Sequence, residues 1–221
     1  MNDNAGDIEP SKLQNFVEAI AITPKDAERL IHGYRSSFEA TYGRPPETLQ
    51  DKARIAKRIV GRYSKLAAAT GAAAALPGVI PGVGTALATV GGGLADLAAS
   101  LKLQIDMCMC LVEVYQSELS GEDKKHLAFV LALAGSAEQM AANGGKIAVE
   151  KTAQKLVLQY LKGPALTTIK QLFKKVAIDF TQKAMAKAVP LGIGVVFSGT
   201  TNYVLTTVVG KITIAVLAKK V

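Results

Sequence analysis

Aromatic residues are scarce in this chain, making up 5% of its 221 residues, and tryptophan is absent. A core with so few rings must be filled mainly by alanine, leucine and valine, a composition typical of helices that pack closely through small side chains. Strand-type alternation bounded by turns is not evident in the sequence. With 49% hydrophobic residues the chain can bury a sizeable core. We therefore expect an all-α, compact multi-helix bundle.

Cysteine and histidine are limited to two residues each, which restricts metal and redox chemistry. Cys108 and Cys110 are two positions apart in a predicted helix and so point to different faces, which favours neither a disulfide nor a shared metal site. We expect them to be small buried side chains in a reducing compartment. His32 and His126 fall in different predicted helices without a ligand set around them, so no metal is expected.

The glycine-rich stretch from Gly78 to Thr85 does not fit a phosphate-binding loop. A P-loop requires G-x-x-x-x-G-K-[ST], and this stretch has Val83 and Gly84 at the second glycine and the lysine. A dinucleotide fingerprint needs glycine or alanine where Leu87 stands. The sequence also offers no nucleophile beside a base. We therefore expect a protein that is not an enzyme and that binds no cofactor.

Arginine is absent after residue 62, although the chain carries a net charge of +8. The missing arginines remove the commonest bidentate reader of bases, so no nucleic acid partner is expected. The predicted helix from about Glu47 toward Thr70 is the most basic part of the chain. Near an anionic membrane each such cation contributes about 1 kcal/mol. The candidate contacts for anionic lipid or a membrane protein are Arg54, Lys57, Arg58, Arg62 and Lys65.

Charge is missing between Lys65 and Asp96 and again between Lys187 and Lys211. Each interval reaches the roughly 20 residues that a helical membrane span requires. The first is interrupted by Pro77 and Pro81, and the second contains Asn202 and several threonines. We expect both to form helices buried in the bundle, with reversible insertion of the pair into a membrane as the alternative.

The two intervals resemble each other. "IPGVGTALATVGGGLAD" and "VPLGIGVVFSGTTNYVLT" each combine an apolar residue, proline, a spaced glycine doublet and a small-residue segment. Small residues at every fourth position let helix backbones approach closely. We expect the two helices to pack together along these stripes, with Asp96 hydrogen-bonded to Asn202 or Thr206. The stripes are Gly84, Ala88, Gly92 and Asp96 in the first helix, and Gly194, Ser198, Asn202, Thr206 and Gly210 in the second.

The helix signals suggest a division of the chain near the end of the basic helix. Residues 1–65 are predicted to be an N-terminal helical extension that contains this helix, and residues 66–221 a helical domain. Thr23, Pro24 and Gly43 have the positions of a cap, a first turn and a stop for one helix, and Ser120 caps another. Further helices are predicted at about 10–22, 84–118, 121–142, 146–162, 165–189 and 193–220.

Three segments of the second part resemble the bacterial EcsC family. They are "IPGVGTALATVGGGLADLAASLKLQIDMCMCLVEVYQ", "LALAGSAEQMAANGGKIAVEKTAQK" and "KAVPLGIGVVFSGTTNYVLTTVVGKITIAVLAK", within residues 66–221, and include Pro81, Asp96, Gln104 and Tyr115. Gln116 departs from the glycine that is usual there. The resemblance implies a helical, cytoplasmic bacterial protein with a membrane-proximal role, and it supplies no catalytic residues.

Together these features predict a non-enzymatic bacterial protein at the inner face of the cell membrane. The basic helix would meet anionic headgroups, and the glycine-rich helices would be available to insert. The opening residues carry Asp3, Asp7 and Glu9 rather than a secretory signal, so a cytoplasmic location is expected. Two alternatives remain open: a soluble helical protein–protein interaction module, including a homo-oligomer, and a pore-forming effector that uses the same helices.

Overall fold

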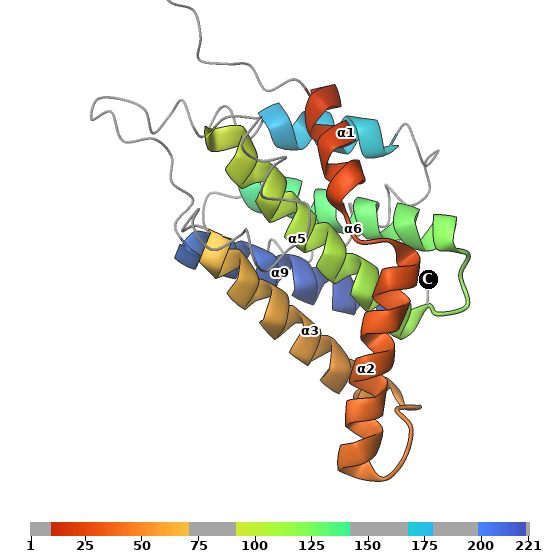
Figure 1. The fold of residues 1–221 in the computed structure, drawn as a ribbon. Coiled ribbons are helices and arrows are strands. Elements are labelled where there is room, and N and C mark those ends of the chain that lie inside the picture. Colours follow the sequence, from red (N-terminus) through yellow and green to blue (C-terminus); the bar gives the residue numbers. More distant parts are fainter. Residues whose placement is uncertain (1–9, 71–91, 142–167, 179–198, 220–221) are drawn as a thin grey trace, which may run out of the picture.

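The computed structural model describes residues 10–70, 92–141, 168–178 and 199–219. Every regular element among these residues is an α-helix, which confirms the all-α prediction for this part of the chain (Figure 1). The helices are α1 (Pro10–Ile20), α2 (Pro24–Tyr42), α3 (Leu49–Thr70), α5 (Gly92–Tyr115), α6 (Gly121–Ala141) and α9 (Gly199–Leu217), with a further helix at residues 168–178.

Capping residues mark both ends of α2 and the start of α6 at the predicted positions. The Thr23 hydroxyl accepts a hydrogen bond from the Asp26 amide at 3.1 Å, so it caps α2. Gly43 ends this helix at a φ of 68°, a left-handed conformation that favours glycine, and its amide donates to the Glu39 carbonyl. Ser120 caps α6 in the same way as Thr23 caps α2. These local signals were correctly predicted.

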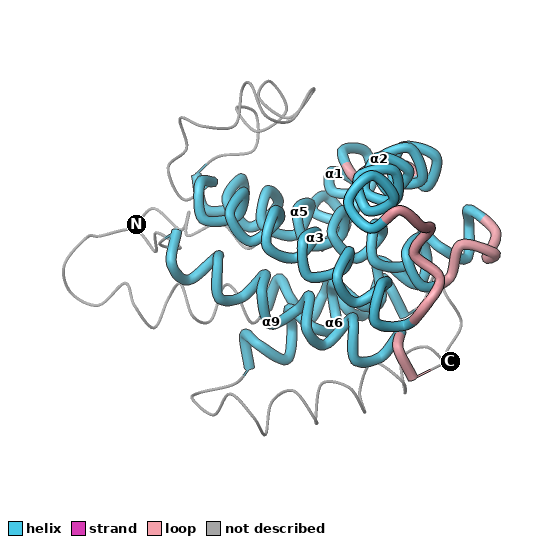
Figure 2. The backbone as a smooth tube through the Cα atoms, turned by 90° about the horizontal axis from the view of Figure 1, so that it is seen from below, coloured by secondary structure: helices cyan, strands magenta, loops and turns pink. Residues whose placement is uncertain are grey.

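Helix α5 lies at the centre of the bundle. Every residue from Leu97 to Tyr115 is buried, and α1, α2, α3, α6 and α9 all pack against this helix. In the view from below, α3 and α5 lie between the α1 and α2 helices on one side and the α6 and α9 helices on the other (Figure 2). The helix therefore has no solvent face over most of its length.

One hydrophobic core connects the first three helices to the others. It contains Leu13 of α1, Ile31 of α2 and Ile59 of α3 together with the buried residues of α5, α6 and α9. The predicted division between residues 65 and 66 falls inside α3, whose buried side chains lie in this shared core. The N-terminal helices are thus integral to the packing in the described part of the chain.

Helices α3 and α9 run antiparallel and approach closely at Gly210. A Cβ atom at Gly210 would lie 2.6 Å from a methyl carbon of Val60 and 3.1 Å from the sulfur of Met107. One turn away, the Thr207 hydroxyl donates to the Ser64 hydroxyl at 2.9 Å. The glycine is needed here because α3 and α5 leave no room for a side chain.

The predicted contact between the two small-residue stripes is only partly within the described residues. Helices α5 and α9 do pack together, and the Cys108 sulfur lies 3.3 Å from the Thr213 hydroxyl. Asn202 and Thr206 are buried on α9, whereas Gly210 faces α3 as well as α5. Gly92 is the first residue of α5. The predicted roles of Gly84, Ala88, Gly194 and Ser198, and the hydrogen bond from Asp96, lie outside what the structure describes.

Charged side chains inside the bundle are paired. Lys102 forms an ion pair with Asp106 one turn along α5, and both are buried. The other carboxylate oxygen of Asp106 accepts the Ile22 amide at 2.8 Å, which ties the link between α1 and α2 to α5. The buried Glu113 carboxylate accepts from the ammonium of Lys124 at 2.7 Å. Because a buried charge without a partner is costly, these pairs are required by the burial of α5.

The substitution Gly210→Ala is expected to lower the free energy of unfolding by roughly 1–3 kcal/mol, because the new methyl group overlaps Val60. The control Gly33→Ala, at an exposed helical glycine with no atom within 4 Å of an added Cβ, should raise it by up to about 1 kcal/mol. Urea unfolding measures both, and Val60→Ala should rescue part of the loss. A Gly210→Ala variant as stable as the Gly33→Ala variant would contradict the close approach.

The substitution Lys102→Met is expected to cost roughly 3–5 kcal/mol at neutral pH, because Asp106 keeps a buried charge without its cation. Burial already raises the pKa of Asp106. The cost should therefore shrink as the pH falls and disappear at about pH 3, below the unfolded pKa of about 3.9, where the carboxyl is protonated in both the folded and the unfolded chain.

The double variant Lys102→Met, Asp106→Asn removes both charges and keeps an acceptor for the Ile22 amide. We expect it to recover more than half of the loss in a double-mutant cycle. If the loss of stability in the double variant equals the sum of the losses in Lys102→Met and Asp106→Asn alone, the ion pair does not couple these residues.

Candidate anion-binding surface

Helix α3 is amphipathic, and its polar side is strongly basic. Ile55, Ile59 and Tyr63 are buried against the core, whereas the cationic residues between them point outward. The structure places all five predicted contact residues on this exposed side: Arg54, Lys57, Arg58, Arg62 and Lys65. The alternation follows from the helical period, which separates the two faces of one helix.

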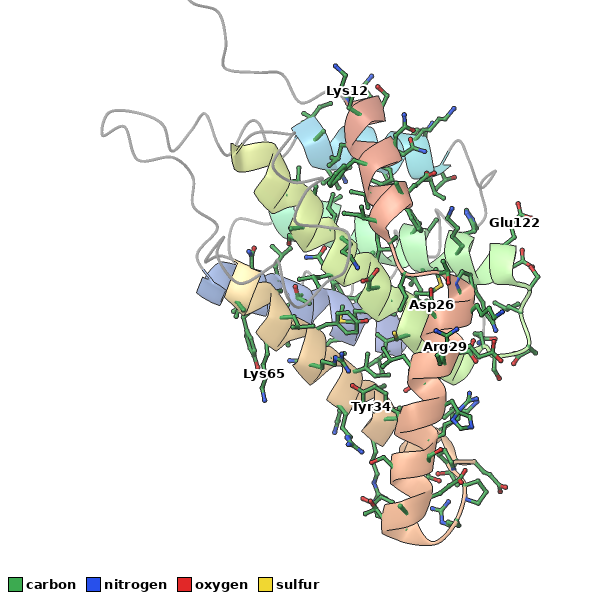
Figure 3. All side chains as sticks on the ribbon, viewed as in Figure 1. Lys12, Asp26, Arg29, Tyr34, Lys65 and Glu122 are labelled. Atoms are coloured by element: carbon green, nitrogen blue, oxygen red, sulfur yellow. The ribbon has the colours of Figure 1, made fainter. Side chains whose placement is uncertain are left out.

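A groove of about 610 Å³ is open to solvent beside this basic side of α3. Tyr34 of α2 contributes to it, and the remaining lining comes from α3. Tyr34 and Lys65 mark its extent on the side of the bundle formed by these two helices (Figure 3). The lining residues are Tyr34, Arg58, Gly61, Arg62, Lys65 and Leu66. Among the described residues, the lining therefore contains three cations and no carboxylate.

Arg58 is held in place at the edge of the groove. Its guanidinium carbon lies 5.5 Å from the centre of the Tyr34 ring, a cation–π distance. One of its nitrogens also donates to the Ser37 hydroxyl at 3.4 Å. Neither contact neutralises its charge. The side chain is thus oriented by α2 while its positive charge remains available.

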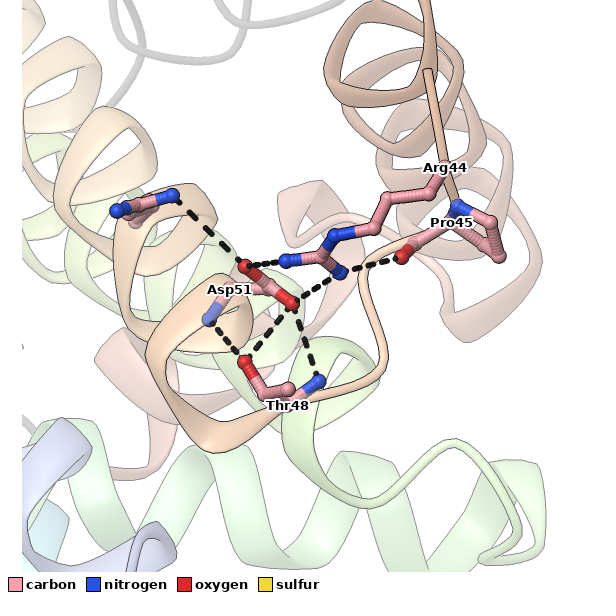
Figure 4. A network of polar contacts seen from close by, with 5 residues as sticks. Arg44, Pro45, Thr48 and Asp51 are labelled. Carbon is pink, nitrogen blue, oxygen red and sulfur yellow. Dashed lines mark hydrogen bonds and ion pairs between the residues drawn. The ribbon is translucent and has the colours of Figure 1, made fainter. Parts of the chain in front are cut away.

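Arg44, in contrast, is fully engaged in a structural network at the corner between α2 and α3 (Figure 4). Its two terminal nitrogens donate to the two Asp51 oxygens at 2.8 and 3.1 Å. Both the amide and the hydroxyl of Thr48 donate to the same carboxylate. The hydrogen bonds from Arg44, followed by those from Thr48, hold the pKa of Asp51 well below its usual range. This network holds the turn between the end of α2 and the start of α3, and so fixes the direction of α3 relative to α2.

The remaining cations of α3 differ in how far they are neutralised. Arg54 lies 3.9 Å from Asp51, which Arg44 already binds. No ion pair in the described part of the chain engages Lys57, Arg62 or Lys65. The C-terminal half of α3 therefore presents positive charge that is not paired with a described carboxylate.

This basic half of α3 points toward one end of the bundle. Because α3 is antiparallel to α5 and α9, its last residue, Thr70, lies at the same end as the first residues of those two helices, Gly92 and Gly199 (Figure 1). The two uncharged stretches of the sequence join the described helices at this end. Lys65 is about one and a half turns from the end of α3.

Two apolar side chains are exposed near the start of α9. Tyr203 and Val204 retain 41% and 42% of their surface. At these two positions α9 departs from the expected burial of the second uncharged interval, whose residues 188–198 lie outside the described ranges. Helix α9 packs against α3, α5 and α6. Val209 and Ile212 are buried on the packed side. Hydrophobic patterning does not indicate which apolar residues of this interval remain exposed.

No helix in the described ranges is long and apolar enough to cross a membrane. The described residues also contain no group of three histidine, cysteine or acidic side chains placed to hold a metal ion. His32 is exposed on α2, and His126 is half-buried on α6. The two histidines thus lie on different helices, as predicted.

The two cysteines are buried side chains on α5. The Cys108 sulfur lies beside Thr213 of α9, and the Cys110 sulfur lies 3.7 Å from the Tyr63 hydroxyl of α3. They therefore contact different neighbouring helices, as their spacing predicts. Burial raises the pKa of each thiol to about 12.

Comparison with known protein families, curated proteins and solved structures finds no match to this chain. The resemblance to the EcsC family therefore stays a prediction from the quoted segments.

We expect neither cysteine of the folded chain to react with a disulfide reagent such as DTNB at pH 8. A thiol with a pKa of about 12 has roughly one part in 10⁴ as thiolate at that pH, and both sulfurs are inaccessible. Both should react at once in guanidinium chloride. Rapid release of the coloured thiolate from the folded chain would contradict the burial of α5.

Proposed function

We propose that this chain binds the surface of an anionic membrane through the basic side of α3, as a peripheral protein without enzymatic activity. The observation that carries the proposal is the row of exposed cations Lys57, Arg58, Arg62 and Lys65, none of which forms an ion pair with another described residue. The proposal places the chain at the cytoplasmic face of a bacterial cell membrane.

The magnitude of the electrostatic attraction supports the proposal. Four cations near an anionic surface contribute about 4 kcal/mol, which corresponds to roughly a thousandfold in affinity. Such an attraction falls off within a Debye length of about 8 Å at physiological ionic strength. The cations must therefore approach the headgroups directly, and their exposed position on an outer helix permits this approach.

The apolar residues at the same end of the bundle add a second contribution. Tyr203 and Val204 are exposed at the start of α9, and an aromatic ring with a polar tip suits the boundary between headgroups and acyl chains. The adjoining uncharged stretches make this the end at which shallow insertion would occur. The cations then attract the chain to the membrane surface, and the apolar side chains enter the boundary between headgroups and acyl chains.

Vesicle flotation at low salt tests the proposal. The wild-type chain should float with vesicles that contain phosphatidylglycerol and remain unbound with phosphatidylcholine alone. The triple variant Arg58→Gln, Arg62→Gln, Lys65→Gln should lose roughly a hundredfold in affinity, because three cations are removed.

The matched control is Lys25→Gln, Lys170→Gln, Lys174→Gln, which removes three exposed charges from other helices. It should bind nearly as well as the wild type. Equal losses of affinity in the two triple variants would show that binding depends on the net charge of the chain and not on the basic side of α3, which would contradict the proposal. A wild-type chain that fails to float would also overturn it. Release of a trapped dye would instead favour the pore-forming alternative.

A further inference from the structure

Gly61, in the middle of α3, has no structural reason to be glycine. In a helix interior glycine is less favourable than alanine by about 1 kcal/mol. The left-handed conformation that requires glycine occurs among the described glycines only at Gly43. A Cβ at Gly61 would meet no atom within 4 Å, whereas one at Gly210 would overlap its neighbours. Neither backbone geometry nor helix packing accounts for Gly61.

The position of Gly61 supplies a reason. This half-buried residue lines the groove beside α3, so any side chain there would fill part of the groove. Arg58 and Lys65 are three and four residues from Gly61, and Arg62, the next residue in the chain, is four residues from Arg58 and three from Lys65. This spacing places the three cations along the side of the helix that Gly61 borders. The missing side chain therefore leaves open space among three cations.

The groove has the charge and size of a small-molecule site. Its volume of about 610 Å³ falls within the roughly 300–1,000 Å³ that is usual for ligand pockets. Tyr34 also lines the groove, from α2, and contacts Arg58 through a cation–π interaction. Since the described residues that line the groove include no carboxylate, its three positive charges favour an anionic ligand group.

Building on the proposed membrane binding, we infer that this groove binds a phosphomonoester. Such a group carries about 1.5 to 2 negative charges at pH 7 and offers three acceptor oxygens, which matches a cluster of three cations better than the single charge of a phosphodiester. The group can be the headgroup of phosphatidic acid in a membrane or part of a soluble phosphorylated molecule. In its lipid form the inference rests on the proposed function.

The substitution Gly61→Leu fills the groove without altering charge, and it improves helix propensity, so the fold is retained. Vesicles of phosphatidic acid and of phosphatidylglycerol, adjusted to equal surface potential, are the lipid probes. The wild-type chain should bind the former about tenfold more tightly, a difference of 1.4 kcal/mol. The readout is the ratio of the two affinities, because an added leucine also changes binding to both kinds of vesicle, and Gly61→Leu should bring this ratio to about one.

The matched control is Gly33→Leu on α2, a helical glycine that also has no atom within 4 Å of an added Cβ but does not line the groove. It should keep the preference. Glycerol 3-phosphate, compared with glycerol in an NMR titration of the full chain, tests the soluble source. Saturable shifts around Tyr34 and Gly61 that vanish in Gly61→Leu would show that the site accepts a free phosphomonoester.

Two negative results have different meanings. If the chain binds phosphatidylglycerol vesicles but shows neither a phosphatidic acid preference nor saturable glycerol 3-phosphate binding, the groove is not a phosphomonoester site, although the membrane function stands. A preference that survives in Gly61→Leu also overturns the inference. If no vesicle binds but glycerol 3-phosphate does, the membrane proposal fails and the groove serves a soluble ligand.

Discussion

The complete burial of α5 is the constraint on which the rest of the structure depends. A helix with neighbours on every side cannot expose its polar groups to water, so each ionised side chain needs a partner inside the protein. Lys102 and Asp106 meet this need within the helix, and Glu113 meets it through Lys124 of α6. The Asp106 carboxylate also accepts a hydrogen bond from the Ile22 amide, so the same buried group fixes the path of the chain between α1 and α2.

The same constraint determines which side of α3 is exposed to solvent. One side of α3 must cover α5 and α9, and Gly210 lets α9 approach closely enough for both contacts. The opposite side is left to solvent and carries the cations. The Arg44–Asp51 network sets how α3 leaves α2, and so brings Tyr34 beside Arg58 and Gly61. The proposed functions of this surface thus follow from the packing of its other side.

Local features were predictable from the sequence because their causes are local. Thr23, Gly43 and Ser120 mark helix ends through contacts with residues a few positions away, and the helical period of α3 places the five predicted contact cations outside. Features that depend on helix crossings were not predictable. The groove at Gly61 requires α2 beside α3, and the exposure of Tyr203 depends on where α3, α5 and α6 pack against α9. Periodicity likewise cannot show that α1, α2 and α3 share one core with α5.

Native-state hydrogen exchange of the α5 amides tests the central position of this helix most directly. If α5 is enclosed as described, its amides from Leu101 to Glu113 exchange only when the whole domain unfolds, with the free energy obtained from urea denaturation. The outer helix α2 exchanges at lower free energy through local opening. Amides of α5 that exchange as readily as those of α2 would contradict the account.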